Sequence, residues 1–158
     1  MADEFLSLFN FEVHLTPSGL GGDETLARRA AFSEVSGLEL NLEIREVREG
    51  GYNLGVRRLV GKASSPNLVL KRGVTLDAGF WEWIQACVNG QFPLPYLSGS
   101  VLQFPPAQQR EEAKAARWTF INGIVTKVKS ADLSAAGGTT LAIEELHIAH
   151  EGLERRLP

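Results

Sequence analysis

The sequence predicts a mainly β fold: a small β-barrel or rolled antiparallel sheets, with one flanking α-helix at about residues 77–89. Several short segments alternate apolar and polar residues with a period of two, whereas one segment alone repeats its apolar residues at helical spacing. The length of 158 residues suits one domain with a core of its own. We therefore expect residues 1–158 to form a single domain without internal repeats.

Composition and charge narrow the class of protein. Apolar residues make up 44% of the chain and charged residues 22%, as in ordinary folded proteins. The net charge of -3 argues against non-specific nucleic-acid binding, which relies on a basic surface. No apolar run approaches the roughly 20 residues of a membrane span, and the acidic start differs from that of a secretory signal. Together with the single cysteine, these features favour synthesis in the cytoplasm.

The strand signals begin near the N-terminus. In "FNFEVHL" (9–15) apolar residues alternate with Glu12 and His14, which predicts a half-buried strand. A glycine-rich loop follows at 16–24, and "AFSEVSG" (31–37) predicts a second strand. Further strand segments are "PNLVLKRG" (66–73), "SVLQF" (100–104), "RWTFINGIVTKVK" (117–129) and "TTLAIEELHIAH" (139–150).

Two of these segments contain irregularities. The Asn122-Gly123 pair predicts a bend or bulge, because asparagine and glycine tolerate the left-handed backbone. The apolar phase shifts between Ile143 and Leu146, so we expect a second bulge there.

The strongest strand signal is "LELNLEIREV" (38–47). Its apolar residues occupy alternate positions from Leu38 to Ile44, so one face should meet a core and the other water or a polar partner. Gly50 and Gly51 allow a turn, and "VRRLVG" (56–61) can return as the partner strand. We expect a long projecting hairpin at about residues 38–60 with a charged tip.

The predicted helix lies within "TLDAGFWEWIQACVNG" (75–90). Asp77 can cap its N-terminus, and Asn89-Gly90 ends it. The apolar stripe that should face the core is Phe80, Trp83, Ile84 and Cys87.

The histidines predict no metal site. Two residues separate His147 from His150 near a strand end, where the two side chains would face opposite ways, and only His14 could complete a set. Ordinary surface or partly buried histidines are the better interpretation.

No other motif indicates catalysis or cofactor binding. Cys87 lies on the apolar stripe of the helix, which favours a buried structural thiol. Glu144, Glu145 and Glu151 are not marked as a paired acid and base, and acidic residues near a strand end are usually solvated. The chain has neither a P-loop nor a Gly-x-Gly-x-x-Gly opening a helix. A ligand-binding or enzymatic barrel would need a convergent set of ionisable residues, and the sequence suggests none.

The motifs together resemble a known family. In order, "FSEVSGLELNLEIREVREGGYN", "LVLKRG", "FWEWI", "WTFING" and "LAIEELHIAHEGL" are similar to the inner-tube proteins of contractile phage tails and extracellular contractile injection systems, from about residue 9 to 153. Tube proteins of type VI secretion share this architecture. The resemblance implies a small β-barrel that assembles into hexameric rings, which stack into a tube inside a contractile sheath.

The resemblance also implies the partners. These would be further copies of the chain, the sheath protein, the baseplate hub or spike and the tube-terminating cap, with no cofactor and no membrane anchoring. After synthesis the chain would become part of a phage tail or an extracellular injection particle. Whether the channel carries DNA or protein stays open.

The same resemblance makes residues 45–59 a contact with a neighbouring subunit or ring. Alternating charges can pair across a repeated contact, and paired glycines allow a close-packed tip. The implied interface residues are Arg45, Glu46, Arg48, Glu49, Gly50, Gly51, Tyr52, Asn53, Arg57 and Arg58. The candidate channel-facing residues are Glu39, Asn41 and Glu43.

Two segments depart from the family pattern. "FPPAQQREEAKAARW" (104–118) is long and charged where a short acidic turn is usual, and "NGIVTKVKSADL" (122–133) replaces an Asn-Ala-Trp-Pro-like stretch. They leave open a tube-initiator or adaptor ring that joins the baseplate hub to the tube. The residues that could make such a variant contact are Gln109, Arg110, Glu111, Glu112 and Lys114.

Overall fold

The computed structural model describes residues 10–17, 29–30, 32–76, 78–105, 115–135 and 141–156. It is mainly β with one helix among these residues, so the predicted fold class is confirmed. The elements are β1 (Phe11–Pro17), β2 (Arg29–Ala30), β3 (Glu34–Ser36), β4 (Asn41–Val47), β5 (Arg57–Ser64), β6 (Leu68–Gly73), α1 (Gly79–Val88), β7 (Leu97–Gln103), β8 (Ala116–Lys129) and β9 (Ile143–Arg156).

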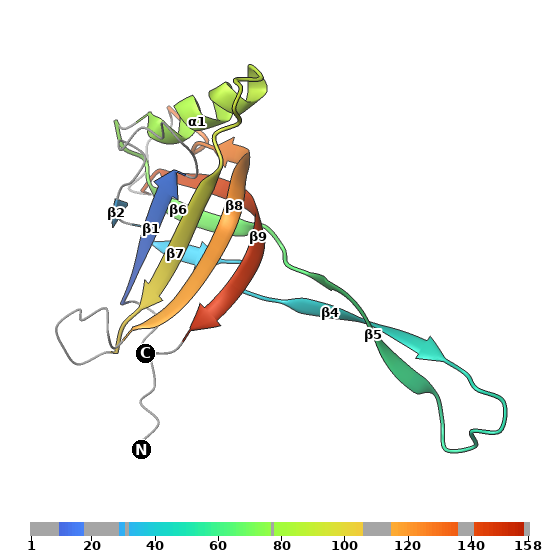
Figure 1. The fold of residues 1–158 in the computed structure, drawn as a ribbon. Coiled ribbons are helices and arrows are strands. Elements are labelled where there is room, and N and C mark those ends of the chain that lie inside the picture. The colour runs from blue at the N-terminus through green and yellow to red at the C-terminus, as the bar shows by residue number, and fades with distance from the viewer. Residues whose placement is uncertain are drawn as a thin grey trace.

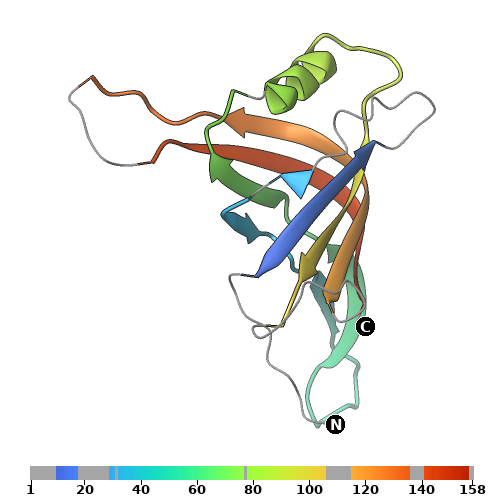
Figure 2. The ribbon, with the colours of Figure 1, turned by 90° about the vertical axis from the view of Figure 1, so that its left-hand side faces the viewer.

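Seven strands form one curled antiparallel sheet in the order β2-β1-β7-β8-β9-β6-β3 (Figure 1). The two longest strands, β8 and β9, lie at its centre. The curl brings side chains of β1 and β6 into one core, although these strands are not neighbours in the sheet. Helix α1 lies across one end of the curl (Figure 2). Among the described residues, no helix has the length and apolar character needed to cross a bilayer.

The core follows the predicted alternation. Val13 and Leu15 of β1 are buried, whereas Glu12 and His14 are on the other face. In β6, Leu68 alternates with partly exposed residues in the same way. The buried core cluster consists of Val13, Leu15, Leu68, Leu70, Phe80, Trp83, Leu97, Val101, Phe120, Val125, Leu146, Ile148 and Leu153.

Helix α1 places its predicted stripe on this core. Phe80 and Trp83 are buried, and Ile84 and Cys87 pack against the cluster. The indole Nε1 of Trp83 donates a hydrogen bond to the Pro95 carbonyl oxygen at 2.7 Å, which satisfies its buried donor.

The ends of the helix agree in part with the prediction. It ends at Asn89 and Gly90 as expected, with Gly90 at φ +67. At the other end, the N-cap position is Ala78, which makes no side-chain cap. The predicted cap Asp77 lies outside the described residues.

The predicted irregularity in β8 is confirmed. Asn122 has φ 51, and the register against β9 shifts between Ile121 and Ile124. Gly123 follows, where a Cβ would lie 2.8 Å from the Phe120 ring. The bend therefore leaves room for a large core side chain.

The bulge expected between Ile143 and Leu146 is wrong. This part of β9 pairs with β6 in regular register. The apolar phase breaks because Glu144 takes the core side of the strand and Ile143 is exposed on the other. Glu144 is also not the solvated acid that we expected, since its side chain is 5% exposed.

A buried ion pair explains how Glu144 is accommodated. Its carboxylate accepts a hydrogen bond from Arg72 Nε at 2.9 Å. The Arg72 guanidinium also lies 3.7 Å from the centroid of the Phe80 ring, in a cation–π contact. A buried carboxylate costs folding free energy unless it is paired, so the two residues depend on one another.

We predict that Trp83→Ala lowers the free energy of unfolding by about 3–5 kcal/mol, because a buried aromatic leaves a cavity and loses its contacts. Trp81→Ala is the matched control, since Trp81 is 39% exposed against 2% for Trp83. Denaturant unfolding of both variants measures the difference. Equal stability of the two variants would contradict the position of Trp83 in the core.

Candidate assembly interface

The hairpin of β4 and β5 projects far from the body (Figure 1). Among the described residues, these strands form a sheet of their own and pair with each other. Every residue of β4 is exposed, and so is all of β5 except Gly61. The predicted hairpin is therefore confirmed, but the expectation that one of its faces meets a core of the same chain is wrong beyond Leu38. Leu38 itself packs against the core.

Gly37 fixes where the hairpin leaves the body. It lies directly after β3 with φ +91, a conformation that L side chains rarely adopt. A Cβ on Gly37 would overlap the carbonyl oxygen of Asn67, at the other foot of the hairpin. The two feet are this close because position 37 has no side chain.

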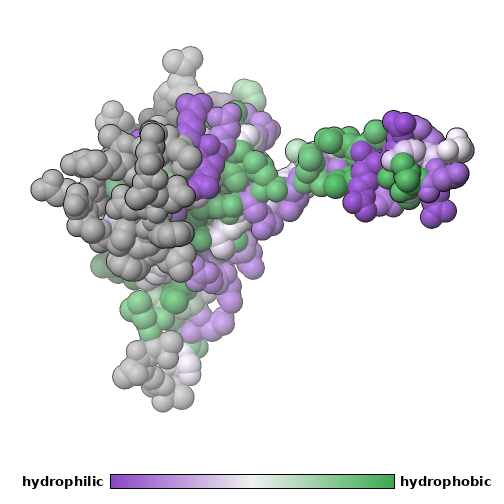
Figure 3. Space-filling model, turned by 90° about the horizontal axis from the view of Figure 1, so that it is seen from below, coloured by the Kyte–Doolittle hydropathy of each residue, from purple (hydrophilic) through white to green (hydrophobic). Residues whose placement is uncertain are grey.

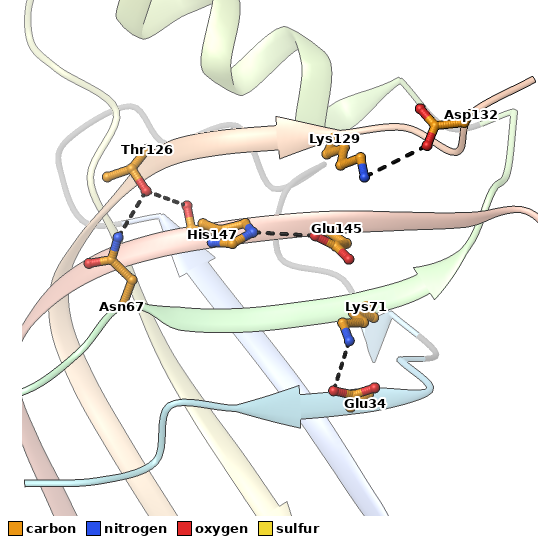
Figure 4. A network of polar contacts seen from close by, with 8 residues as sticks. All are labelled: Glu34, Asn67, Lys71, Thr126, Lys129, Asp132, Glu145 and His147. Carbon is orange, nitrogen blue, oxygen red and sulfur yellow. Dashed lines mark hydrogen bonds and ion pairs between the residues drawn. The ribbon is translucent and has the colours of Figure 1, made fainter.

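A polar network ties the second foot to the sheet (Figure 4). Asn67 Nδ2 donates to Thr126 Oγ1 of β8 at 3.3 Å, and Thr126 Oγ1 donates to the His147 carbonyl oxygen of β9 at 3.2 Å. The direction of the hairpin is thus set by contacts with the two central strands.

The hairpin ladder contains a bulge. Leu42 pairs with Ala63 and Ile44 pairs with Val60, so β5 has one more residue than β4 between these pairs. A Cβ at Gly61 would lie 2.8 Å from the Glu43 carbonyl oxygen, which makes glycine the fitting residue at the bulge.

Most charges near the tip are paired within the hairpin. Arg57 Nε lies 2.9 Å from Glu49 Oε2, and Arg58 Nε lies 3.4 Å from Glu46 Oε1. Arg57 also lies 5.4 Å from the centroid of the Tyr52 ring. These pairs are exposed and each contributes little stability, but they brace the two strands.

The remaining predicted interface residues are exposed. In the part of the chain that the structure describes, Arg45 and Arg48 have no ion-pair partner. Gly51 has φ 89 in the turn, as its predicted role requires. The other exposed residues of the predicted contact are Gly50 and Asn53.

The candidate channel-facing residues lie at the base of the hairpin. Glu39, Asn41 and Glu43 are all exposed, and Asn41 Nδ2 donates to Glu39 Oε1 at 3.2 Å. The predicted variant contact residues Gln109, Arg110, Glu111, Glu112 and Lys114 lie outside the described residues.

The large sheet carries a row of alternating charge on the face away from its core (Figure 4). The strand register places Lys129, Glu145, Lys71 and Glu34 opposite one another across β8, β9, β6 and β3. Lys71 Nζ lies 3.0 Å from Glu34 Oε1. The hydrogen bond and charge of Glu34, with Glu145 adding, raise the pKa of Lys71. Opposite charges on neighbouring strands support this register.

The histidines and the cysteine fit structural roles. Among the described residues, no three metal-ligating side chains cluster. His150 is tilted against the Phe120 ring at 5.5 Å, and its ring nitrogens are buried. Burial lowers the pKa of His150 below 6.5, and the Pro66 backbone offsets part of this effect. Burial raises the pKa of the Cys87 thiol, which disfavours the reactive thiolate.

Sequence reasoning missed three of these positions. The lone Gly37 after a strand signals a special backbone conformation, but not which residue approaches it. Gly61 inside the apolar "LVG" run is a recognisable bulge signal. The Arg72–Glu144 pair had no sequence signal, because each residue lies in a segment that also exposes charges.

These features define a class of protein: a β-rich module with a core of its own and a long arm left exposed for assembly. The sequence profile of the T4-like virus tail tube protein gp19 family matches residues 7–154, and the chain belongs to this family. The family resemblance inferred from the sequence is thereby confirmed. Among curated proteins, none matches the chain in sequence.

Solved structures share the fold. A chain of the anti-feeding prophage (AFP) baseplate has TM-score 0.78 and 20% identity, over 99% of this chain and 97% of that one. A chain of the PVC sheath-tube complex, from an extracellular contractile injection system, has TM-score 0.76 and 18% identity, over 99% and 95%. Hcp1 from Salmonella typhimurium has TM-score 0.52 and 12% identity, over 94% and 87%.

We predict that Gly37→Ala lowers the free energy of unfolding by about 1–3 kcal/mol, the usual cost of a non-glycine residue in this backbone region. Gly50→Ala is the control, because its φ is not positive and a Cβ there meets nothing within 4 Å. Denaturant unfolding measures both. A Gly37→Ala variant as stable as Gly50→Ala would contradict the close approach to Asn67.

His150 predicts a loss of stability in acid. Well above pH 6.5 the imidazole is neutral in the folded and unfolded chain alike. As the pH falls, the unfolded chain binds a proton that the buried imidazole resists, so the free energy of unfolding falls until the folded-state pKa is passed. Urea unfolding between pH 8 and pH 5 should show a smaller fall for His150→Phe than for the wild type. An equal fall in the free energy of unfolding for both proteins would refute the contribution of His150 to the loss of stability in acid.

Proposed function

We propose that the chain is a structural subunit, without a catalytic step, that forms hexameric rings stacked into the inner tube of a contractile injection machine or phage tail. Contraction of the sheath would drive this tube through the target envelope. Membership of the tail tube family supports the proposal. The observation that carries it is the β4–β5 hairpin, which is exposed along its length although the body has its own core.

The physical argument is that this hairpin needs a neighbour. A lone two-stranded hairpin is marginal in water, since it lacks a third strand or a packed face. A contact between different surfaces of identical subunits repeats along an axis, so a modest interface is multiplied many times. In this proposal residues 45–59 reach the adjacent subunit or ring, and Arg45 and Arg48 supply charges that are not paired within the described hairpin.

The partners follow from the same proposal. They are further copies of this chain, the sheath protein, the baseplate hub or spike and the terminating cap. Chains of similar fold occur in structures of an AFP baseplate and of a PVC sheath-tube complex, which supports these partners. Glu39, Asn41 and Glu43 would face the channel near the hairpin base. The channel cargo, DNA or protein, depends on whether the particle is a phage tail or an injection system.

Negative-stain electron microscopy of the purified chain across a concentration series tests the proposal. Hollow tubes or stacked rings are the expected result. Single rings that never stack would indicate instead an initiator layer that needs the baseplate hub. Monomers at every concentration, with and without baseplate partners, would overturn both readings.

We predict that replacing residues 41–64 by a short Gly-Ser linker abolishes rings and tubes while the melting temperature stays within a few degrees. The body should still fold because no residue of this segment belongs to the core cluster. Circular dichroism melting and electron microscopy measure the two effects. A truncated chain that still forms tubes at the wild-type concentration would show that the hairpin is not the contact.

A further inference from the structure

We propose that an apolar strip on one face of the hairpin, rather than its charged tip, docks the hairpin onto a second copy of this chain. The inference rests on the proposed function and names the chemistry of the contact. The apolar strip consists of Leu40, Leu42, Ile44, Val60 and Ala63.

The bulge in β5 creates the apolar strip. Residues opposite one another in an antiparallel pair share a face, so Leu42 and Ala63 lie on the same face as Ile44 and Val60. In a regular ladder continuing from the Ile44–Val60 pair, Lys62 would stand opposite Leu42. The extra residue moves the lysine out of the strip and places a methyl group there.

The apolar strip is exposed in the single chain. Ile44 is 57% and Val60 75% exposed, and Leu42 is 54% exposed. Figure 3 shows hydrophobic residues gathered along the stem of the hairpin and mostly hydrophilic ones toward its tip. Contiguous exposed apolar residues with a polar border are typical of a protein–protein contact.

The opposite face of the hairpin differs in chemistry. There Arg45 pairs with Leu59, and Val47 pairs with Arg57, so charges interrupt the apolar residues. At the tip, Arg57 and Arg58 are held by Glu49 and Glu46 within the hairpin itself. These charges are paired within the hairpin, whereas the residues of the apolar strip have no place in the body's core cluster.

A second copy of the chain offers a counterpart. Leu133 follows β8, and Leu141 and Ile143 lie where β9 begins; they are 93%, 73% and 42% exposed. Leu141 lies beside Gly73 of β6, and because Gly73 has no side chain it leaves Leu141 uncovered on that side. One chain therefore exposes apolar side chains on the hairpin and, separately, near the end of β8 and the start of β9. A contact between them is heterologous and repeats from copy to copy, as a tube requires.

Polar substitutions on the two hairpin faces test the inference. Ile44→Ser and Val60→Ser remove apolar side chains from the strip, whereas Leu59→Ser is the matched control on the other face, with Leu59 52% exposed. The readout is the protein concentration at which tubes or rings pellet in the ultracentrifuge. We expect a rise of at least about tenfold for each strip variant and less than about threefold for Leu59→Ser. The melting temperatures of all three should equal that of the wild type.

A change at the bulge is an independent test. Gly61→Val would place a side chain against the Glu43 carbonyl oxygen, so the ladder must shift and the strip loses its alignment. This variant should fold with the wild-type melting temperature and should fail to assemble. Assembly of Gly61→Val at the wild-type concentration would overturn the role of the bulge.

The outcomes separate this inference from the proposed function. If the wild type forms tubes, the hairpin-truncated chain does not, and Ile44→Ser and Val60→Ser assemble like the wild type, the apolar strip is wrong while the tube function stands. If Leu59→Ser raises the protein concentration needed for assembly as much as Val60→Ser does, the proposal that only the apolar-strip face makes the contact is refuted. If the wild type forms neither rings nor tubes, the proposed function is wrong, and the docking of the apolar strip onto a second copy is wrong with it.

Discussion

The close approach of Gly37 to the Asn67 carbonyl is the constraint on which the exposed arm depends. It brings the two feet of the hairpin together, and the hydrogen bonds from Asn67 through Thr126 to His147 tie one foot to the centre of the sheet. Without a side chain at position 37, the chain can leave β3 with a left-handed backbone. The direction of the whole arm follows from this contact together with the hydrogen bonds of Asn67 and Thr126.

In our proposal, stability and assembly are divided between two parts of the chain. The body has the buried cluster around Trp83 and Phe120, and the Arg72–Glu144 pair inside it. The hairpin contributes none of its side chains to that cluster. Its apolar residues would therefore release hydrophobic free energy only when another molecule covers them. Such a division lets a subunit fold alone and still require neighbours to complete its buried surface.

Paired charges order both the large sheet and the hairpin. Across the open face of the large sheet, Lys129, Glu145, Lys71 and Glu34 alternate in sign, which supports the strand register. In the hairpin, the Glu–Arg pairs near the tip brace two strands that pair only with each other among the described residues. In both places the paired charges mainly order the molecule itself. In our proposal the attraction between subunits comes mainly from the apolar strip, beside the charges of Arg45 and Arg48, which are not paired within the described hairpin.

The sequence by itself determined the fold class, the helix, the hairpin and the bend at Asn122, because periodicity and turn residues act over a few neighbouring positions. It could not determine which apolar faces find a core. The alternation from Leu38 to Ile44 is the same whether the covering side chains come from this chain or from another. Likewise, a glutamate in a strand is expected at the surface. Glu144 is buried because the fold places Arg72 beside it as a hydrogen-bonded partner. Those outcomes depend on contacts between distant segments, and only the tertiary structure decided them.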